Sequence, residues 1–96
     1  MGTPDEVRGF LSAFLACAGR QGLRGRWAGA DEVWVWVPGE RLGVAVSCRT
    51  VHEYGPAVLL LGGTTPLGSA GECADAVARL KGLFAVWIEE DQQGFR

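Results

Sequence analysis

The fold is decided by two stretches of sequence, residues 32–37 (EVWVWV) and residues 42–49 (LGVAVSCR), which are separated by a Pro-Gly turn signal. In both stretches apolar residues alternate with other residues at a period of two, the spacing of a strand with one buried face. They predict a hairpin in which valines of one strand lie beside the leucine and valines of the next. On the opposite face, Trp34 and Trp36 are expected across from Gly43, Ala45 or Arg41. Because Pro-Gly favours a type II turn, we expect a connection of four residues.

Two further strands are expected beside this hairpin. Residues 23–27 (LRGRW) form a short candidate strand that places Arg24 and Arg26 on one side. Residues 57–61 (AVLLL) are apolar on both faces, as in a strand that is covered on both sides. Residues 51–56 are rich in turn-forming residues, and residues 62–68 are expected to form a loop. The sequence thus predicts an antiparallel meander of about four strands.

A helix is predicted before the meander. Thr3-Pro4-Asp5-Glu6 is a capping box with proline at the first helical position. Apolar side chains then recur at helical spacing as far as Ala18, and Gly19 or Gly22 can end the helix.

A second helix is predicted after the meander. Ser69-Ala70-Gly71-Glu72 is another capping box, and an apolar stripe follows it, formed by Cys73, Val77, Leu80, Phe84 and Trp87. The spacing favours one helix that continues through Gly82. Residues 83–89 could instead form a fifth strand, because the acidic residues 89–91 are unfavourable at a helix C-terminus.

These elements predict a single α+β domain over residues 1–96, with both helices on the valine face of the sheet. This order of elements is similar, by architecture alone, to small adaptor folds that include secretion-chaperone-like domains.

Composition narrows the classes of partner. The net charge of −2 and the isoelectric point near 5.3 provide no overall attraction to nucleic acid or to an anionic membrane. No apolar run approaches the roughly 18 residues of a membrane span, and the N-terminus lacks a basic segment. Cys17, Cys48 and Cys73 are an odd number of cysteines, which suits reduced thiols. We therefore expect a cytoplasmic protein without membrane contact.

The tryptophans of the hairpin are the strongest surface feature. Large aromatic side chains on the solvent side of a sheet are costly to expose, so they are expected to cover a second copy of the chain or another protein. If the chain itself covers both sheet faces, they are core. The favoured function is a small protein-binding module, homodimeric and adaptor-, inhibitor- or chaperone-like. It would bind through an edge strand or through a face formed by Trp34, Trp36, Arg41, Arg49 and Trp27.

An alternative function is the binding of single-stranded nucleic acid. Residues 19–27 contain Arg20, Arg24 and Arg26 beside Trp27, with no acidic residue. Arginines interleaved with aromatic side chains can contact a phosphate backbone and stack on bases. A polar connection between a helix and a strand would have the same composition.

A second alternative is a thiol or metal enzyme that uses Cys48, His52 and Cys73. On one strand, positions 48 and 52 would lie about 13 Å apart, which is too far for one zinc ion. Residues 44–49 carry no acidic residue that could serve in a nuclease-type site, and the acidic residues at positions 32, 40 and 53 only flank the strands. We therefore expect no enzyme activity, no metal and no cofactor.

Overall fold

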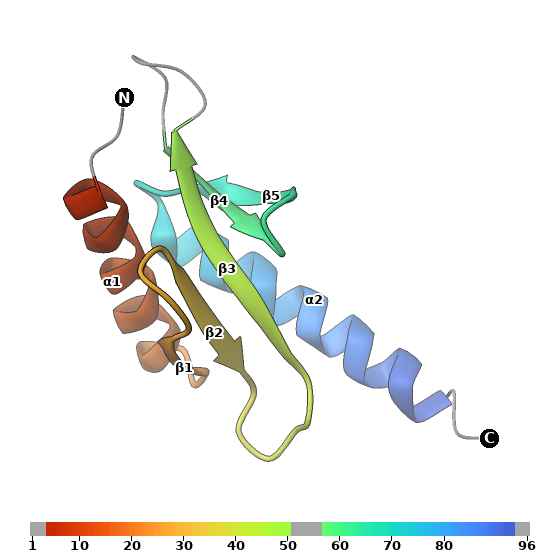
Figure 1. Ribbon diagram of the computed structural model, residues 1–96. Coiled ribbons are helices and arrows are strands. Elements are labelled where there is room, and N and C mark those ends of the chain that lie inside the picture. The colour runs from red at the N-terminus through yellow and green to blue at the C-terminus, as the bar shows by residue number, and fades with distance from the viewer. Residues whose placement is uncertain (1–3, 51–56, 94–96) are drawn as a thin grey trace.

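The chain folds as an N-terminal helix, a sheet and a C-terminal helix in a computed structural model that describes residues 4–50 and 57–93 (Figure 1). The elements are α1 (Pro4–Arg20), β1 (Arg24–Trp27), β2 (Glu32–Trp36), β3 (Gly43–Thr50), β4 (Ala57–Leu61), β5 (Thr65–Ser69) and α2 (Cys73–Gln93). The strands pair antiparallel in chain order, from β1 to β5. The predicted α+β fold with a meander is confirmed.

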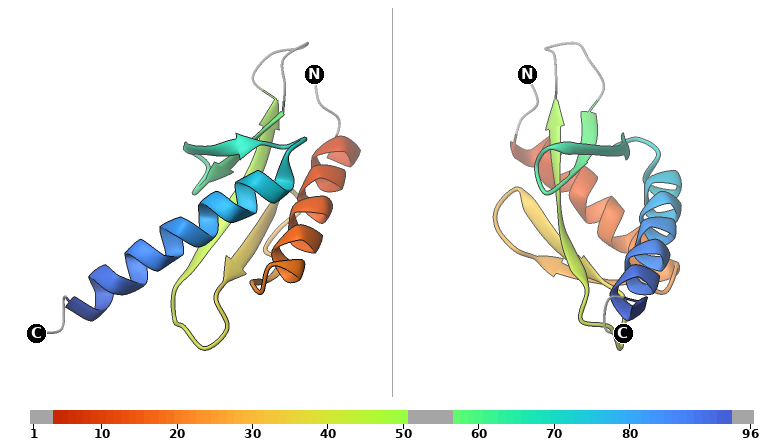
Figure 2. Two further views of the ribbon diagram at one scale, coloured as in Figure 1. Left: turned by 180° about the vertical axis from the view of Figure 1, so that it is seen from behind. Right: turned by 90° about the vertical axis from the view of Figure 1, so that its right-hand side faces the viewer.

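Both helices lie on one face of the sheet, which we call the inner face (Figure 2). The side chains between them and the sheet are fully or almost fully buried: Leu11, Phe14 and Ala18 from α1, Val33, Val35, Val46 and Leu59 from the strands, and Val77, Leu80 and Phe84 from α2. The predicted helix stripes and the valine positions therefore form one core.

The first helix ends as its glycines predict. The amide of Leu23 donates to the carbonyl of Ala18 at 2.9 Å, and the amide of Gly22 donates to that of Gly19 at 3.3 Å. Gly22 has φ of 89°, so the two bonds form the glycine-dependent cap that closes many helices. This cap turns the chain from α1 into β1. Thr3, the first residue of the predicted capping box, lies outside the described residues.

The second helix is continuous through Gly82, so the alternative of a strand at residues 83–89 is wrong. It begins at Cys73, later than the capping box at Ser69 predicts. Ser69 belongs to β5, and its hydroxyl accepts a hydrogen bond from the Gly71 amide at 3.3 Å. The carbonyl of Glu72 accepts the first helical bond, from Ala76 at 3.1 Å.

The fifth strand is β5, which occupies most of the predicted loop at residues 62–68 and extends to Ser69. Gly62 and Gly63 have φ of 61° and 80° and reverse the chain after β4. Pro66 is accommodated because β5 is an edge strand. Leu59 and Leu61 of β4 belong to the core, whereas Leu60 faces the other side of the sheet. The strand β4 therefore presents apolar side chains on both faces, as its sequence predicts.

The connection between β2 and β3 is longer than predicted. Trp36 pairs with Gly43, so residues 37–42 connect the strands. The amide of Glu40 donates to the carbonyl of Val37 at 3.1 Å, and Gly39 has φ of 87°, which gives the predicted type II turn around Pro38-Gly39.

Among the described residues, neither helix combines the length and the apolar character that a membrane span requires.

Candidate functional site

The candidate site is the outer face of the sheet, which neither helix covers (Figure 1). The valines of β2 point toward the helices, so Trp34 and Trp36 point away from them. In the register, Arg24 lies opposite Trp36 and Arg26 lies opposite Trp34. Directly opposite residues of an antiparallel pair share a face, so two exposed arginines adjoin the two tryptophans.

The indole of Trp34 lies across β3 rather than projecting freely. A Cβ atom added at Gly43 would meet atoms of this ring at 2.6 to 2.7 Å. The ring therefore occupies the space that any other residue at position 43 would fill. Even so, Trp34 remains 38% exposed and Trp36 half-buried. Both tryptophans are thus partly accessible within the single chain.

The outer face extends from the tryptophans toward β4. Leu60 lies opposite Ser47, and Val58 lies opposite Arg49. Leu60 is 9% exposed and is not part of the core between sheet and helices. Arg49 is exposed at this far end, four positions along β3 from the partner of Trp34 and thus about 13 Å away from it.

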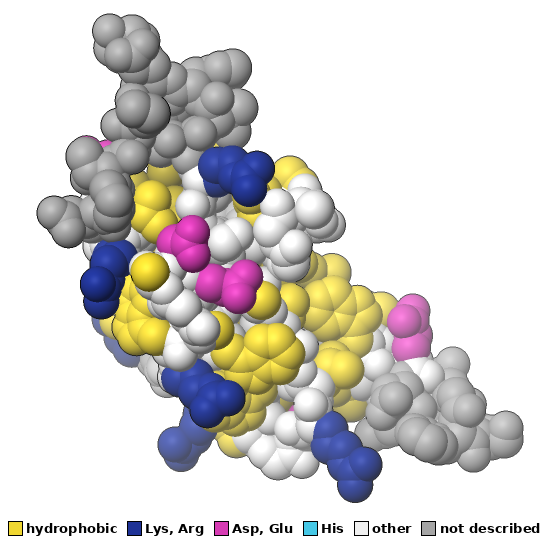
Figure 3. Space-filling model, in the orientation of Figure 1, with side chains coloured by type: hydrophobic (Ala, Val, Ile, Leu, Met, Phe, Trp, Pro, Cys, Tyr) yellow, Lys and Arg dark blue, Asp and Glu magenta, His cyan; other side chains and the backbone are white. Residues whose placement is uncertain are grey.

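Figure 3 shows how these side chains appear at the surface. Hydrophobic groups gather over β2 and β3 and, beside them, over the part of α2 that passes beyond the sheet, with Lys or Arg side chains at several points around them and Asp or Glu side chains between them. The exposed residues in that part of α2 include Val86, Glu89 and Glu90. The outer face thus combines aromatic and basic groups with the acidic Glu32, which shares the face of Trp34 and Trp36, and the projecting part of α2 combines apolar and acidic groups.

The structure places one residue of the predicted binding face on the other side of the sheet and another outside the strands. Trp27 lies opposite the buried Val33, so its side chain is on the inner side. There the guanidinium carbon of Arg8, in α1, stands 5.3 Å from the centroid of its ring. Arg41 is exposed in the β2–β3 connection rather than on a strand. Arg24 and Arg26, which the sequence prediction assigns to the nucleic-acid alternative and to the strand adjoining this face, are the cations in register with the tryptophans.

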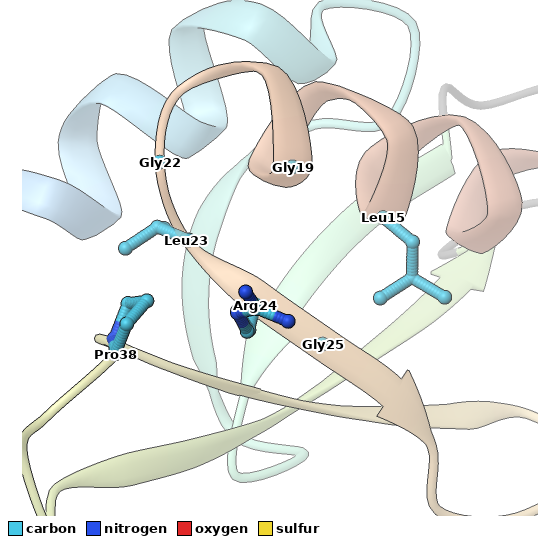
Figure 4. Close-up of a pocket in the computed structure, with 7 residues that line it drawn as sticks. All are labelled: Leu15, Gly19, Gly22, Leu23, Arg24, Gly25 and Pro38. Atoms are coloured by element: carbon cyan, nitrogen blue, oxygen red, sulfur yellow. The ribbon is translucent and has the colours of Figure 1, made fainter.

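An open pocket lies where α1 turns into β1 (Figure 4). The side chains of Leu15, Leu23 and Pro38 surround it, with Arg24 between them. The remaining lining residues are glycines, and Arg24 is the one ionisable side chain among the described residues that line it. The pocket therefore presents one cation among apolar side chains and backbone.

The three cysteines occupy two separate environments. Cys48 lies on the inner side of β3, buried, and burial alone raises the pKa of its thiol. Cys17, near the end of α1, accepts a hydrogen bond from Nη2 of Arg20 at 3.1 Å. Cys73, at the start of α2, has a pKa raised first by a hydrogen bond with the Cys17 side chain and then by burial, while Arg20 acts in the opposite direction.

These environments bear on the proposed thiol or metal enzyme. Cys73 adjoins Cys17 and Arg20, a grouping that sequence reasoning missed because the residues are far apart in the chain. His52 lies outside the described residues. Within residues 4–50 and 57–93, no three His, Cys, Asp or Glu side chains are grouped so that they could hold a metal ion.

Comparison with models of protein families, with curated proteins and with solved structures finds no significant match for this chain.

Proposed function

We propose that this chain is a small cytoplasmic protein-binding module that acts as a homodimer, in the manner of an adaptor, inhibitor or chaperone. The observation that carries the proposal is the position of Trp34 and Trp36, partly exposed on the sheet face that neither helix covers. Aromatic side chains with neighbouring arginines are the residue types enriched in protein interfaces.

The partner on this face is a second copy of the chain. The face carries Arg24, Arg26 and Arg49 around its apolar centre against the single acidic Glu32 among its described strand residues, whereas the last turns of α2 carry Glu89 and Glu90. The exposed Val86 adds an apolar group to that end of the helix. In a two-fold dimer each sheet face receives the acidic end of the other copy's α2. The contact between the arginines of one copy and the glutamates of the other therefore occurs twice.

The first measurement is the mass of the chain in solution by light scattering over a dilution series, with tryptophan emission recorded at each concentration. We expect a dimer that dissociates on dilution, with emission that shifts to the red as tryptophans meet water. Because the interface includes charge pairs, high salt should weaken it. A chain that stays monomeric at every concentration would contradict the homodimer.

Charge reversal tests which surfaces meet. Arg24→Glu with Arg26→Glu, and separately Glu89→Arg with Glu90→Arg, should each weaken the dimer about tenfold or more, equivalent to at least about 1.4 kcal/mol. A chain that carries all four changes should recover the dimer, because each copy then presents the exchanged pair. Arg79→Glu with Lys81→Glu is the matched control, since these exposed residues of α2 lie off the sheet face. The Glu-to-Arg variant should remain folded, because cations are favourable at a helix C-terminus.

Nucleic-acid binding is the second candidate, favoured by the register of Arg24 and Arg26 with the two tryptophans. The structure does not place all its predicted residues together: Trp27 is on the inner side, and Arg20 belongs to α1 and binds a thiol. The same samples can be titrated with an oligothymidine strand at low and physiological salt. A monomer that binds the strand with steeply salt-dependent affinity would replace the homodimer with this function.

A further inference from the structure

The last turn of α1 packs against the first turn of α2. Nε2 of Gln21, just after α1, donates a hydrogen bond to the carbonyl of Ala74 in α2 at 3.2 Å. Cys17 lies four residues before Gln21, one helical turn away and so on the same side of α1. Cys73 directly precedes Ala74. The contact between the helices therefore brings two sulfur atoms from distant parts of the chain into one place.

The two thiols differ in access and share a cation. Cys17 is 4% exposed and belongs to the core, whereas Cys73 is half-buried and packs against its edge. The Arg20 guanidinium donates to Sγ of Cys17 at 3.1 Å, and the Cys17 side chain lies near enough to Cys73 to raise the pKa of its thiol. The Cys17 side chain and burial raise the pKa of the Cys73 thiol, and Arg20 opposes them. The reactivity of the pair therefore rests on the accessibility of Cys73 and on the closeness of the two cysteines, with Arg20 favouring the thiolate of Cys73.

We propose that Cys17 and Cys73 form a dithiol site that exchanges with low-molecular-weight disulfides, such as glutathione disulfide, and closes to a disulfide between α1 and α2. This site does not depend on the proposed interface, because its residues lie between the helices and not on the outer face of the sheet.

The exchange proceeds in two steps. The more accessible Cys73 loses its proton to solvent, and the thiolate attacks one sulfur of glutathione disulfide, which forms a Cys73–glutathione disulfide and releases one glutathione thiolate. Cys17, after losing its proton, then attacks the Cys73 sulfur and expels the second glutathione thiolate. The two glutathione thiolates take up the two protons. The protein dithiol is oxidised by two electrons, and one glutathione disulfide is reduced to two glutathione molecules.

The third cysteine provides an internal control. Cys48 is buried on β3, and its pKa is raised by burial with no cation to oppose it. Buried thiols of this kind are inert until the protein unfolds. Cys48 should therefore neither exchange nor alkylate in the folded chain.

The test uses the full chain carrying Cys48→Ser, reduced, then equilibrated with glutathione buffers of increasing oxidised fraction, quenched with acid and analysed by intact mass. We expect a species that has lost two hydrogen atoms and carries no adduct. Adding Cys17→Ala should stop the reaction at the mixed disulfide with Cys73. Adding Cys73→Ser instead should leave the chain almost unmodified, because Cys17 is shielded.

Arg20→Gln should slow closure several-fold relative to the parent, whereas Arg79→Gln, on the exposed side of α2, should not. Circular dichroism on every variant should show that the chain is folded. If Cys17→Ala does not fold, Cys73→Ser still tests whether Cys73 is the residue that reacts. The oxidised chain should also unfold at higher urea concentration, because the new bond restricts the unfolded chain. A folded parent that yields only glutathione adducts, only disulfide-linked dimers or no product at all would overturn the proposal.

Discussion

The two faces of the sheet contain large apolar side chains from the same strands, but only one face is covered by helices. On the inner face, Val33, Val35, Val46 and Leu59 are fully buried. On the outer face, Trp34 is 38% exposed, although tryptophan has far more apolar surface to bury than valine. The inner-face and outer-face side chains alternate along the same strands, so the strands themselves do not cause this difference in burial. It arises because the helices cover only the inner face.

The comparison separates stability from binding. Side chains on the inner face gain their full contact area within one chain, so they serve the fold. The partly exposed side chains on the outer face retain area that a partner can cover. Neighbouring residues with opposite orientations therefore allow the two roles to be tested with matched substitutions.

The largest expected effect is at Leu59 and Leu60, which are adjacent on β4 and face opposite sides. Leu59→Ala should lower the free energy of unfolding by about 2 to 5 kcal/mol, because it leaves a cavity in the covered core. Leu60→Ala removes the same atoms from a side chain that is 9% exposed on the outer face and lies outside the core cluster, so it should cost roughly half as much. Urea denaturation of both variants measures the difference. Equal losses would mean that the outer face around Leu60 is packed as tightly as the inner face, which would contradict the division between the two faces.

A smaller effect is expected where Trp34 crosses Gly43. Gly43→Val should cost about 1 to 3 kcal/mol, because the new side chain must displace the indole ring. In a Trp34→Ala background the ring is absent, and valine, a favourable strand residue, should be neutral or stabilising at this position. The four unfolding free energies form a double-mutant cycle, and we expect a coupling of at least about 1 kcal/mol. The same cost in both backgrounds would show that the ring does not rest on Gly43 in solution.

Much of this arrangement follows from local sequence patterns. The period of two in β2 and β3 assigns Val33 and Trp34 to opposite faces, and the spacing in α1 assigns Phe14 to the core, as the structure shows. The same parity along residues 23–27 places Trp27 with Leu23 and Gly25, away from Arg26, although the predicted binding face includes Trp27 with the other tryptophans.

The features that the sequence could not predict depend on tertiary contacts. β5 contains proline and glycine within five residues and has no apolar alternation, so it is a strand only because β4 offers an edge for pairing. The position of Cys17 beside Cys73 depends on how α1 and α2 cross, and no spacing along the chain encodes that angle. The proposed interface was predicted from strand periodicity, whereas the proposed dithiol site required the packed helices.

The smallest expected effect distinguishes Trp27 from Trp34, which are both 38% exposed but lie on opposite faces. Arg8 stacks on the Trp27 ring, and Arg8→Ala should cost about 0.5 to 1 kcal/mol through the loss of this cation–π contact. Arg8→Lys keeps the charge but not the planar stack, so it should cost less than the alanine change. Neither variant should alter the dimer measured by light scattering, since Trp27 belongs to the helix side of the sheet. A weaker dimer in Arg8→Ala, with unchanged stability, would place Trp27 at the interface and contradict the division of roles between the two faces.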